Sequence, residues 1–335
     1  MESVAPGRSC AALACMAFAA IASAAAGQQP PAWKPERNVE IVVSAGPGGN
    51  QDQTARTIQA IWQEKKTVPL SIVTNKPGGG GAIAYTYVSQ HPRDPHYLLM
   101  LAPTLFSSRV MGQIKFQHTD FTPVATLFEE YLFVSVRSDS PIRTGRDLIE
   151  RLKTKPDSLS IALATALGNH LHLGLALPMK AAGVDIRRML MVPYKSSGES
   201  LTALLGGHID VAISTFGTVL PHLEAGRIRV IGVSAPRRLT GILANVPTWR
   251  EQGADAVFSS WRGMAAPKGI GDAQVQYWES ALQTMAATDE WKKDVEKNFR
   301  VNRFLNGRES SKYWDEQYRE VESALTEIGL AKTAN

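Results

Sequence analysis

The chain has only two cysteines, Cys10 and Cys15, and both lie within its first 26 residues. We therefore expect no disulfide, thiol chemistry or cysteine metal site in the rest of the chain. Aromatic residues make up only 7% of the sequence, and no long block of Lys and Arg occurs, so nucleic-acid binding has little support. No stretch of about 18 uninterrupted apolar residues follows residue 26, so we expect no membrane span in the mature chain.

The motifs of nucleotide-dependent and hydrolytic enzymes are also missing. The G-x-G-x-x-G fingerprint of dinucleotide-binding folds fails at its last glycine, where the two glycine-rich segments have Gln51 and Ile83. The chain has neither a G-x-x-x-x-G-K-[ST] phosphate loop nor a G-x-S-x-G nucleophile elbow. We therefore expect a protein that is not an enzyme and that needs no cofactor and no metal.

The first 26 residues have the features of a secretory signal peptide. Arg8 precedes an apolar stretch over residues 10–21, and the three alanines at 24–26 form an A-x-A cleavage site. An ordinary first helix is the alternative, and lipidation at Cys15 has little support because Ala12 replaces the leucine that this reaction requires. We expect residues 1–26 to be removed on export to the periplasm, with cleavage after Ala24 as the alternative.

The remaining chain is long and apolar enough for about two domains. It has 335 residues, 44% of them apolar, and a net charge of +5, which is a weak argument for anionic partners. Apolar, β-branched runs alternate with helix-like stretches, which is typical of an α/β fold with mostly parallel sheets. The predicted strands cover 39–44, 70–74, 97–101, 131–136, 159–164, 189–192, 211–214, 229–234 and 263–265. The predicted helices cover 53–64, 82–89, 145–153, 170–182, 199–205, 273–288 and 310–328.

Two changes in the pattern suggest where the domains meet. We place one crossing near residues 129–131 and a second within residues 235–245. Residues 31–130 and 240–335 would then form domain 1, and residues 131–239 would form domain 2.

Two glycine-rich loops follow predicted strands and precede predicted helices. The first is Gly-Pro-Gly-Gly-Asn-Gln-Asp at 46–52, and the second is Asn-Lys-Pro-Gly-Gly-Gly-Gly at 75–81. Glycine allows the backbone to approach a ligand closely, and a helix start presents free N–H groups and a partial positive charge. Two such loops on neighbouring strands predict a site for one small anion.

The order of several motifs resembles the periplasmic receptors of tripartite tricarboxylate transporters, the Bug family. The Pro-Gly-Gly-x-x-Asp motif is at 47–52, the Asn-x-Pro-Gly-x-Gly-Gly loop at 75–81 and the Val-Pro-Tyr-Lys turn at 192–195. Leu-Leu-Gly-Gly-His-Ile-Asp at 204–210 and Ala-Gly-Arg-Ile-Arg at 225–229 fit the same family. Each motif alone is weak, but their order and spacing together are specific.

The resemblance implies a type II periplasmic-binding-protein fold, in which two α/β domains close like a clamshell. It also implies a monomer that binds a small carboxylate and delivers it to the membrane permease subunits of a tripartite tricarboxylate transporter. A receptor that passes a signal to a membrane partner is the alternative, which the sequence cannot separate from transport.

The candidate ligand contacts are residues of the family motifs and of the loops that are expected to bind an anion. They are Pro47, Gly48, Gly49, Asn50, Gln51, Asp52, Gly78, Gly79, Gly80, Thr165, Asn169, His170, Lys195, Ser214 and Thr215. Asn50 and Gln51 replace small hydroxyl residues that are common in the family, and they either extend the hydrogen-bond set or face solvent. A negative charge beside an anion favours a different role for Asp52, as the N-cap of the first helix.

Several residues of the second half keep two interpretations. His170 either contacts the ligand or caps its helix, and it makes a poor metal pair with His172 because the two lie on different helix faces. Lys195 is a cation near the cleft or a solvated surface charge. Leu167 is bulky for its loop and suggests a partly apolar ligand surface. For Arg262 we favour an exposed position over a bidentate contact with a carboxylate.

Overall fold

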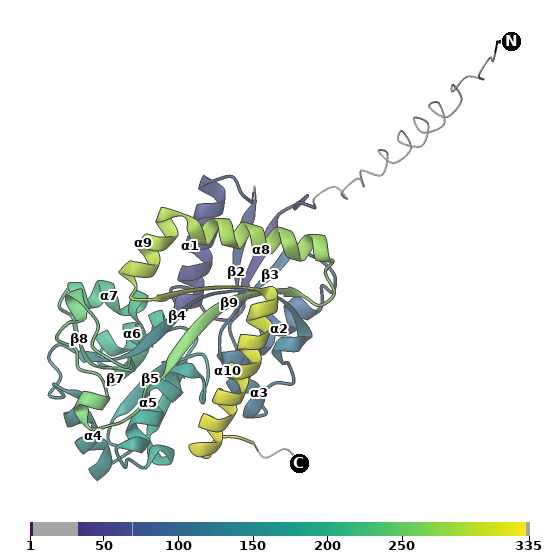
Figure 1. The fold of residues 1–335 in the computed structure, drawn as a ribbon. Coiled ribbons are helices and arrows are strands. Elements are labelled where there is room, and N and C mark those ends of the chain that lie inside the picture. Colours follow the sequence, from purple (N-terminus) through teal and green to yellow (C-terminus); the bar gives the residue numbers. More distant parts are fainter. Residues whose placement is uncertain (3–32, 69, 333–335) are drawn as a thin grey trace. The chain divides into compact units, whose positions relative to one another are not determined.

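The computed structural model describes residues 1–2, 33–68 and 70–332 (Figure 1). Contacts divide the chain into a short unit, Met1–Trp33, and a body, Lys34–Asn335, and the description below concerns the body. Apart from residues 1 and 2, the predicted signal peptide lies outside the described residues. In the described ranges no helix is both long and apolar enough to cross a bilayer, and no group of three potential metal ligands occurs.

The described part of the body contains ten strands and ten α-helices. The strands are β1 (Val39–Val43), β2 (Ser71–Asn75), β3 (Tyr97–Leu101), β4 (Phe121–Arg137), β5 (Ser160–Ala164), β6 (Leu190–Tyr194), β7 (Val211–Thr215), β8 (Ile228–Val233), β9 (Ser259–Pro267) and β10 (Val301–Asn306). The helices are α1 (Asn50–Glu64), α2 (Ala82–Ser89), α3 (Thr104–Val110), α4 (Gly145–Thr154), α5 (His170–Ala181), α6 (Ser197–Leu205), α7 (Phe216–Glu224), α8 (Asp272–Ala287), α9 (Asp289–Lys297) and α10 (Gly307–Glu327).

Every predicted strand and helix is present, although most ends shift by one to three residues. The sequence analysis missed β10, α3, α7 and α9. It also placed the start of β4 at residue 131, whereas this strand begins at Phe121. Register shifts between Pro123 and Phe128 interrupt the alternation of buried and exposed side chains, and this hid the first half of β4.

The strands form one mixed sheet in the order β2-β1-β3-β9-β4-β7-β5-β6, and β8 and β10 also pair with β4. The predicted parallel pairing occurs in the two outer groups, β2-β1-β3 and β7-β5-β6. The strands between them, β9 and β4, pair antiparallel with their neighbours. Figure 1 shows β4 and β9 between the two outer groups.

Strand β4 belongs to both halves of the sheet. Its residues up to Tyr131 pair with β9 and β10, and its residues from Leu132 onward pair with β7 and β8. The carboxyl ends of parallel strands in each half carry the loops that precede α1, α2 and α5, as ligand sites in α/β folds require.

Stacked tryptophans fill the core of the half that contains β9. The rings of Trp261 and Trp314 lie parallel with centroids 5.4 Å apart, and both side chains are fully buried. The indole N–H of Trp314 donates to the Thr126 hydroxyl at 3.0 Å, so its polar atom is satisfied. Gly263 is required beside this stack, because a Cβ there would lie 2.6 Å from the Trp314 ring.

Candidate functional site

The first glycine loop packs directly against the start of α6. The N–H of Gly46 donates to the Lys195 carbonyl at 2.9 Å. A Cβ on Gly49 would lie only 3.2 Å from the Cβ of Ser196, so a larger residue would push the two segments apart. The β1–α1 loop and the β6–α6 loop therefore form one continuous surface.

Asp52 stabilises this loop but does not cap the helix, so the predicted N-cap role is wrong. Helix α1 begins at Asn50 with Gly49 as its N-cap residue, and no side chain caps it. Asp52 lies in the first turn, where its Oδ2 accepts the N–H of Gly48 at 3.0 Å and an Nε bond from Arg56 at 3.0 Å. Burial alone would raise the pKa of Asp52, but these hydrogen bonds outweigh it and lower the pKa.

The β5–α5 loop is fixed by its own polar side chains. Asn169 caps α5, because its Oδ1 accepts the N–H of His172 at 3.0 Å. The Asn169 amide also donates to the Ala164 carbonyl and to the Thr165 hydroxyl, the latter at 3.0 Å. Thr165 has a positive φ of 69° and donates its N–H to the Tyr194 carbonyl at 2.7 Å. The side chain of Asn169 is therefore committed to the loop.

A small cavity of about 20 Å³ lies where these segments meet. Its lining is Ala45, Gly49, Asn50, Gln51, Ala164, Thr165, His170, Leu171, Ser196, Ser197 and Arg262. Three helices begin at this cavity, since Asn50, His170 and Ser197 are the first residues of α1, α5 and α6. The partial positive charges of three helix starts favour an anion here.

Five of the predicted contacts line this cavity: Gly49, Asn50, Gln51, Thr165 and His170. Two others, Ser214 and Thr215, are buried, and the Thr215 hydroxyl accepts a hydrogen bond from the Asn50 amide at 2.6 Å. The side chain of Lys195 is exposed.

The second glycine loop lies outside the cavity lining. Gly78 to Gly81 all have positive φ angles, between 57° and 126°, which glycine alone adopts without strain. The Ser108 hydroxyl donates to the Gly80 carbonyl at 3.0 Å, so this loop packs against α3. Contacts of Gly78, Gly79 and Gly80 with a ligand stay predictions. Pro47 lines a more open pocket beside α6.

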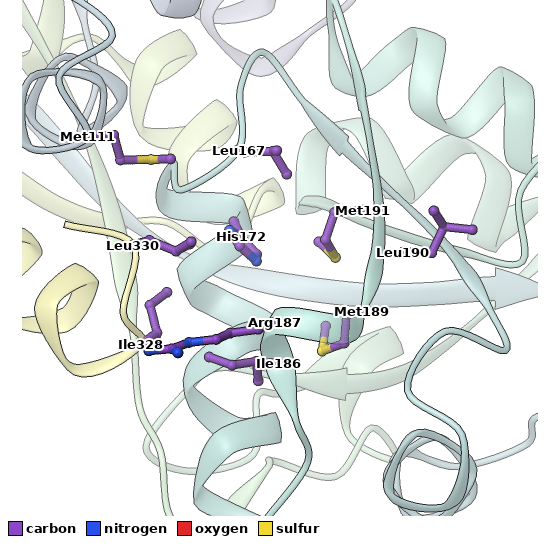
Figure 2. Close-up of a pocket in the computed structure, with 10 residues that line it drawn as sticks. All are labelled: Met111, Leu167, His172, Ile186, Arg187, Met189, Leu190, Met191, Ile328 and Leu330. Atoms are coloured by element: carbon purple, nitrogen blue, oxygen red, sulfur yellow. The ribbon is translucent and has the colours of Figure 1, made fainter. Parts of the chain in front are cut away.

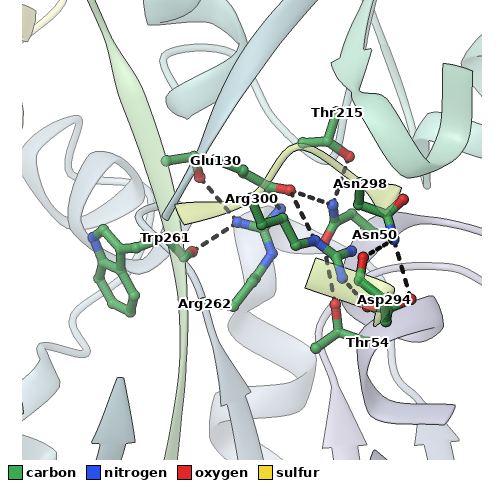
Figure 3. A network of polar contacts seen from close by, with 10 residues as sticks. Asn50, Thr54, Glu130, Thr215, Trp261, Arg262, Asp294, Asn298 and Arg300 are labelled. Atoms are coloured by element: carbon green, nitrogen blue, oxygen red, sulfur yellow. Dashed lines mark hydrogen bonds and ion pairs between the residues drawn. The ribbon is translucent and has the colours of Figure 1, made fainter. Parts of the chain in front are cut away.

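The expectation of an exposed Arg262 is wrong, because this side chain is only 2% exposed. Its Nη2 lies 2.9 Å from Glu130 Oε1 (Figure 3). Its Nη1 donates to the Ser260 hydroxyl at 2.9 Å and to the Trp261 carbonyl at 2.7 Å. Among the described residues, Arg262 Nε has no hydrogen-bond partner, although it is buried at the wall of the cavity.

Glu130 connects Arg262 to a second buried arginine. Its Oε2 accepts the Asn50 amide at 2.7 Å and lies 3.7 Å from Arg300 Nε, and Arg300 also pairs with Asp294 (Figure 3). Two buried guanidinium groups thus share one buried carboxylate. Burial lowers the pKa of Arg262, Glu130 opposes this effect and Arg300 adds to it.

His170 lines the same cavity with a neutral side chain. Burial, and then the charge of Arg262, hold the pKa of His170 well below its usual range. Its Nδ1 lies 3.3 Å from the Thr104 hydroxyl, with which it shares a hydrogen bond. Arg262 is therefore the one charged side chain among the described residues that line the cavity.

Sequence reasoning missed Glu130, Ser196 and Ser197, and it favoured the wrong alternative for Arg262. A signal for the two serines was present, because Ser-x-x-Glu at 196–199 is typical of a helix start. The Ser196 hydroxyl indeed accepts the N–H of Glu199 at 3.2 Å. The Glu130–Arg262 pair leaves no local signal, because its members are distant in sequence and meet only through the pairing of β4 with β9.

Comparison with known proteins shows the family to which this chain belongs. The model of the tripartite tricarboxylate transporter family receptor, TctC, matches residues 54–330. Protein BugT of Bordetella pertussis (strain Tohama I) is 30% identical over 264 residues, which cover 76% of this chain and 79% of BugT.

Two solved structures show the same α/β periplasmic-binding-protein fold. The periplasmic binding protein BugD is 23% identical, with a TM-score of 0.81, over 89% of this chain and all of BugD. The R. palustris protein Rpa4515, solved with adipate, is 26% identical, with a TM-score of 0.81, over 89% of this chain and 99% of that protein.

Proposed function

Because this chain belongs to the tripartite tricarboxylate transporter receptor family, we propose that it captures a small carboxylate between two lobes and passes it to the permease of such a transporter. The family is one of periplasmic binding proteins and not of enzymes. The adipate found in Rpa4515 supports a carboxylate as the ligand class. We further propose that the predicted signal peptide exports the chain and that the mature receptor is a monomer.

We propose that the two halves of the sheet correspond to the two lobes. The change of partners on β4 at Tyr131 and Leu132 supports the first predicted crossing. For the second crossing we propose β9 in place of residue 240. Leu243 and Trp249 support this choice, because they pack into the hydrophobic clusters of β4, β5, β7 and β8.

The main support for the proposed ligand class is the position of Arg262. It is a buried cation with an unpartnered Nε at a cavity where three helices begin. A carboxylate oxygen at this place would accept from Arg262 Nε and from the free N–H groups of the helix starts. The neutral His170 and the hydroxyls of Ser196 and Ser197 add donors without adding negative charge.

The closeness of the two lobes supports binding by hinge closure. The cavity of about 20 Å³ fits about one water molecule, so a carboxylate can enter only when the lobes separate. Contacts between the lobes include Asn50 to Thr215 and Gly46 to Lys195. A ligand would stabilise the closed form by its higher affinity for that state.

A thermal-shift panel on the mature chain tests this function. The panel contains adipate, succinate, malate, citrate, glutamate, nicotinate, benzoate and terephthalate, with neutral sugars as controls. An acid at a hundred times its Kd should add about 2.7 kcal/mol of stability. A shift with one class of acids, repeated on protein refolded from denaturant, would support the proposal. No shift with any acid after refolding would contradict it.

A further inference from the structure

A second, larger pocket lies behind the loop that joins β5 to α5. Its volume is about 250 Å³, well above that of the small cavity at Arg262. Figure 2 shows Met111, Leu167, Met189 and Met191 around it, with His172 near the middle. An engineered apolar cavity of about 150 Å³ already binds benzene, so this pocket has room for a larger organic molecule.

This pocket is separate from the cavity at Arg262. His170 lines the small cavity and His172 lines the large pocket. Residues two apart on a helix point to different sides, so the first turn of α5 lies between the two spaces. The pocket has walls from both proposed lobes, because Met111 follows α3 and Leu330 follows α10, whereas Leu167 belongs to the β5–α5 loop.

The walls are mostly apolar and deformable. Three methionines line the pocket, and this side chain adapts readily to ligands of different shape. Leu167 and Leu190 line it as well, yet they are 38% and 51% exposed. An apolar ligand would cover both leucines and remove their exposed surface from water.

One buried polar group at this pocket has no hydrogen-bond partner among the described residues. His172 is 4% exposed, and its Nδ1 accepts the N–H of Gly168 at 2.9 Å. Nδ1 therefore carries no proton in the neutral ring, and the proton is on Nε2, which has no hydrogen-bond partner in the described ranges. Burial lowers the pKa of His172 to about 4, so the ring is neutral at pH 7.

Arg187 supplies a cation at the same pocket. Its guanidinium packs over Gly329, where a Cβ would lie 2.1 Å from Nη2. It forms no ion pair with any described acidic residue, whereas the adjacent Arg188 lies 3.9 Å from Asp157. The pocket thus combines an apolar interior, an unpaired cation and one buried N–H donor.

We propose that this pocket is a second ligand site, for a monocarboxylic acid with a medium-length apolar body. The carboxylate pairs with Arg187 and accepts from the Nε2–H of His172, and the apolar body contacts the methionines and leucines. Such an acid has a longer apolar body than the small carboxylate of the proposed transport site. Because the two spaces share no lining residue, the inference stands independently of that site.

Octanoate is the probe, and the isotope-labelled methyl groups of methionine report where it binds. We expect octanoate to shift the ¹³C-methyl signals of Met111, Met189 and Met191. The signals of Met264 and Met285, which are buried elsewhere, should stay unchanged. Shifts confined to other methionines, or no shifts, would overturn the proposal.

Calorimetric titration measures the role of the cation. We expect Arg187→Gln to weaken octanoate binding about tenfold, which corresponds to about 1.4 kcal/mol. The matched control Arg188→Gln should leave the affinity unchanged. Both arginines are exposed, so neither variant should impair folding. Octanamide should bind wild-type protein and Arg187→Gln equally. Equal octanoate affinities in both variants would show that Arg187 does not bind the carboxylate and would refute the site.

Discussion

Replacing Arg262 with Gln should separate ligand binding from the stability of the buried network. Arg262→Gln takes away the nearest cation to Glu130, at 2.9 Å, and leaves the Asn50 amide at 2.7 Å and Arg300 at 3.7 Å. Breaking a buried ion pair by removing one partner costs about 3–5 kcal/mol. Because Arg300 stays close to Glu130, we expect the free energy of unfolding to fall by about 3 kcal/mol, the lower end of this range.

The double variant Arg262→Gln/Glu130→Gln provides the control for stability. It removes both charges of the pair, and the new amide oxygen can still accept from Asn50. We expect it to regain most of the lost stability, because no buried charge is left without its partner. Its affinity for the carboxylate should stay about 100-fold below that of wild-type protein, which corresponds to about 2.7 kcal/mol.

Two assays distinguish the possible outcomes. Denaturant unfolding, followed by tryptophan fluorescence, gives the stability of each variant, and calorimetric titration with the best acid of the panel gives its affinity. A double variant that binds the acid as tightly as wild-type protein would refute the role of Arg262 as ligand anchor. An Arg262→Gln variant as stable as wild-type protein would refute the energetic reasoning about the pair.

Three other variants test single features of the structure. Trp314→Ala should lower the free energy of unfolding by about 3–5 kcal/mol in denaturant unfolding, because it empties a fully buried ring position; a loss below 1 kcal/mol would contradict this packing. Gly49→Val should abolish carboxylate binding in calorimetry with the fold intact by circular dichroism, because its Cβ would lie 3.2 Å from Ser196 and hinder closure; unchanged affinity would exclude that contact. The low pKa of His172, about 4 against a usual value of about 6.5, means that the unfolded chain binds more protons between these pH values. The free energy of unfolding should therefore fall by roughly 3 kcal/mol as the pH is lowered from 6.5 to 4. His172→Asn should reduce this loss in unfolding measured against pH, and the exposed control His208→Asn should not; equal losses in both variants would contradict the assignment.

Local patterns predicted most of the fold. Apolar runs such as 39–43 and 97–101 became β1 and β3, because they are buried on both sides of the sheet. Strand β10 was missed because Val-Asn-Arg-Phe-Leu-Asn mixes polar and apolar residues at half-exposed positions. Helix α9 was missed, because the predicted helix ended at residue 288, although Thr288 caps α9 by accepting the N–H of Trp291.

The candidate site was only partly readable from the sequence. The glycine-rich composition of residues 46–49 predicted the first loop, and the structure places the last of these glycines at the cavity. Arg262 had no such signal, because its burial depends on Glu130 from another strand and on Asn50 beyond it. Long-range pairing between strands decides the position of such a charge, and short motifs do not report it.

The most direct measurement is a crystal structure with the best acid of the panel. We expect a carboxylate oxygen within hydrogen-bond distance of Arg262 Nε, in the cavity that Gly49, Ser196 and Arg262 line. An acid bound elsewhere, with Arg262 still paired only with Glu130, would contradict the proposed site.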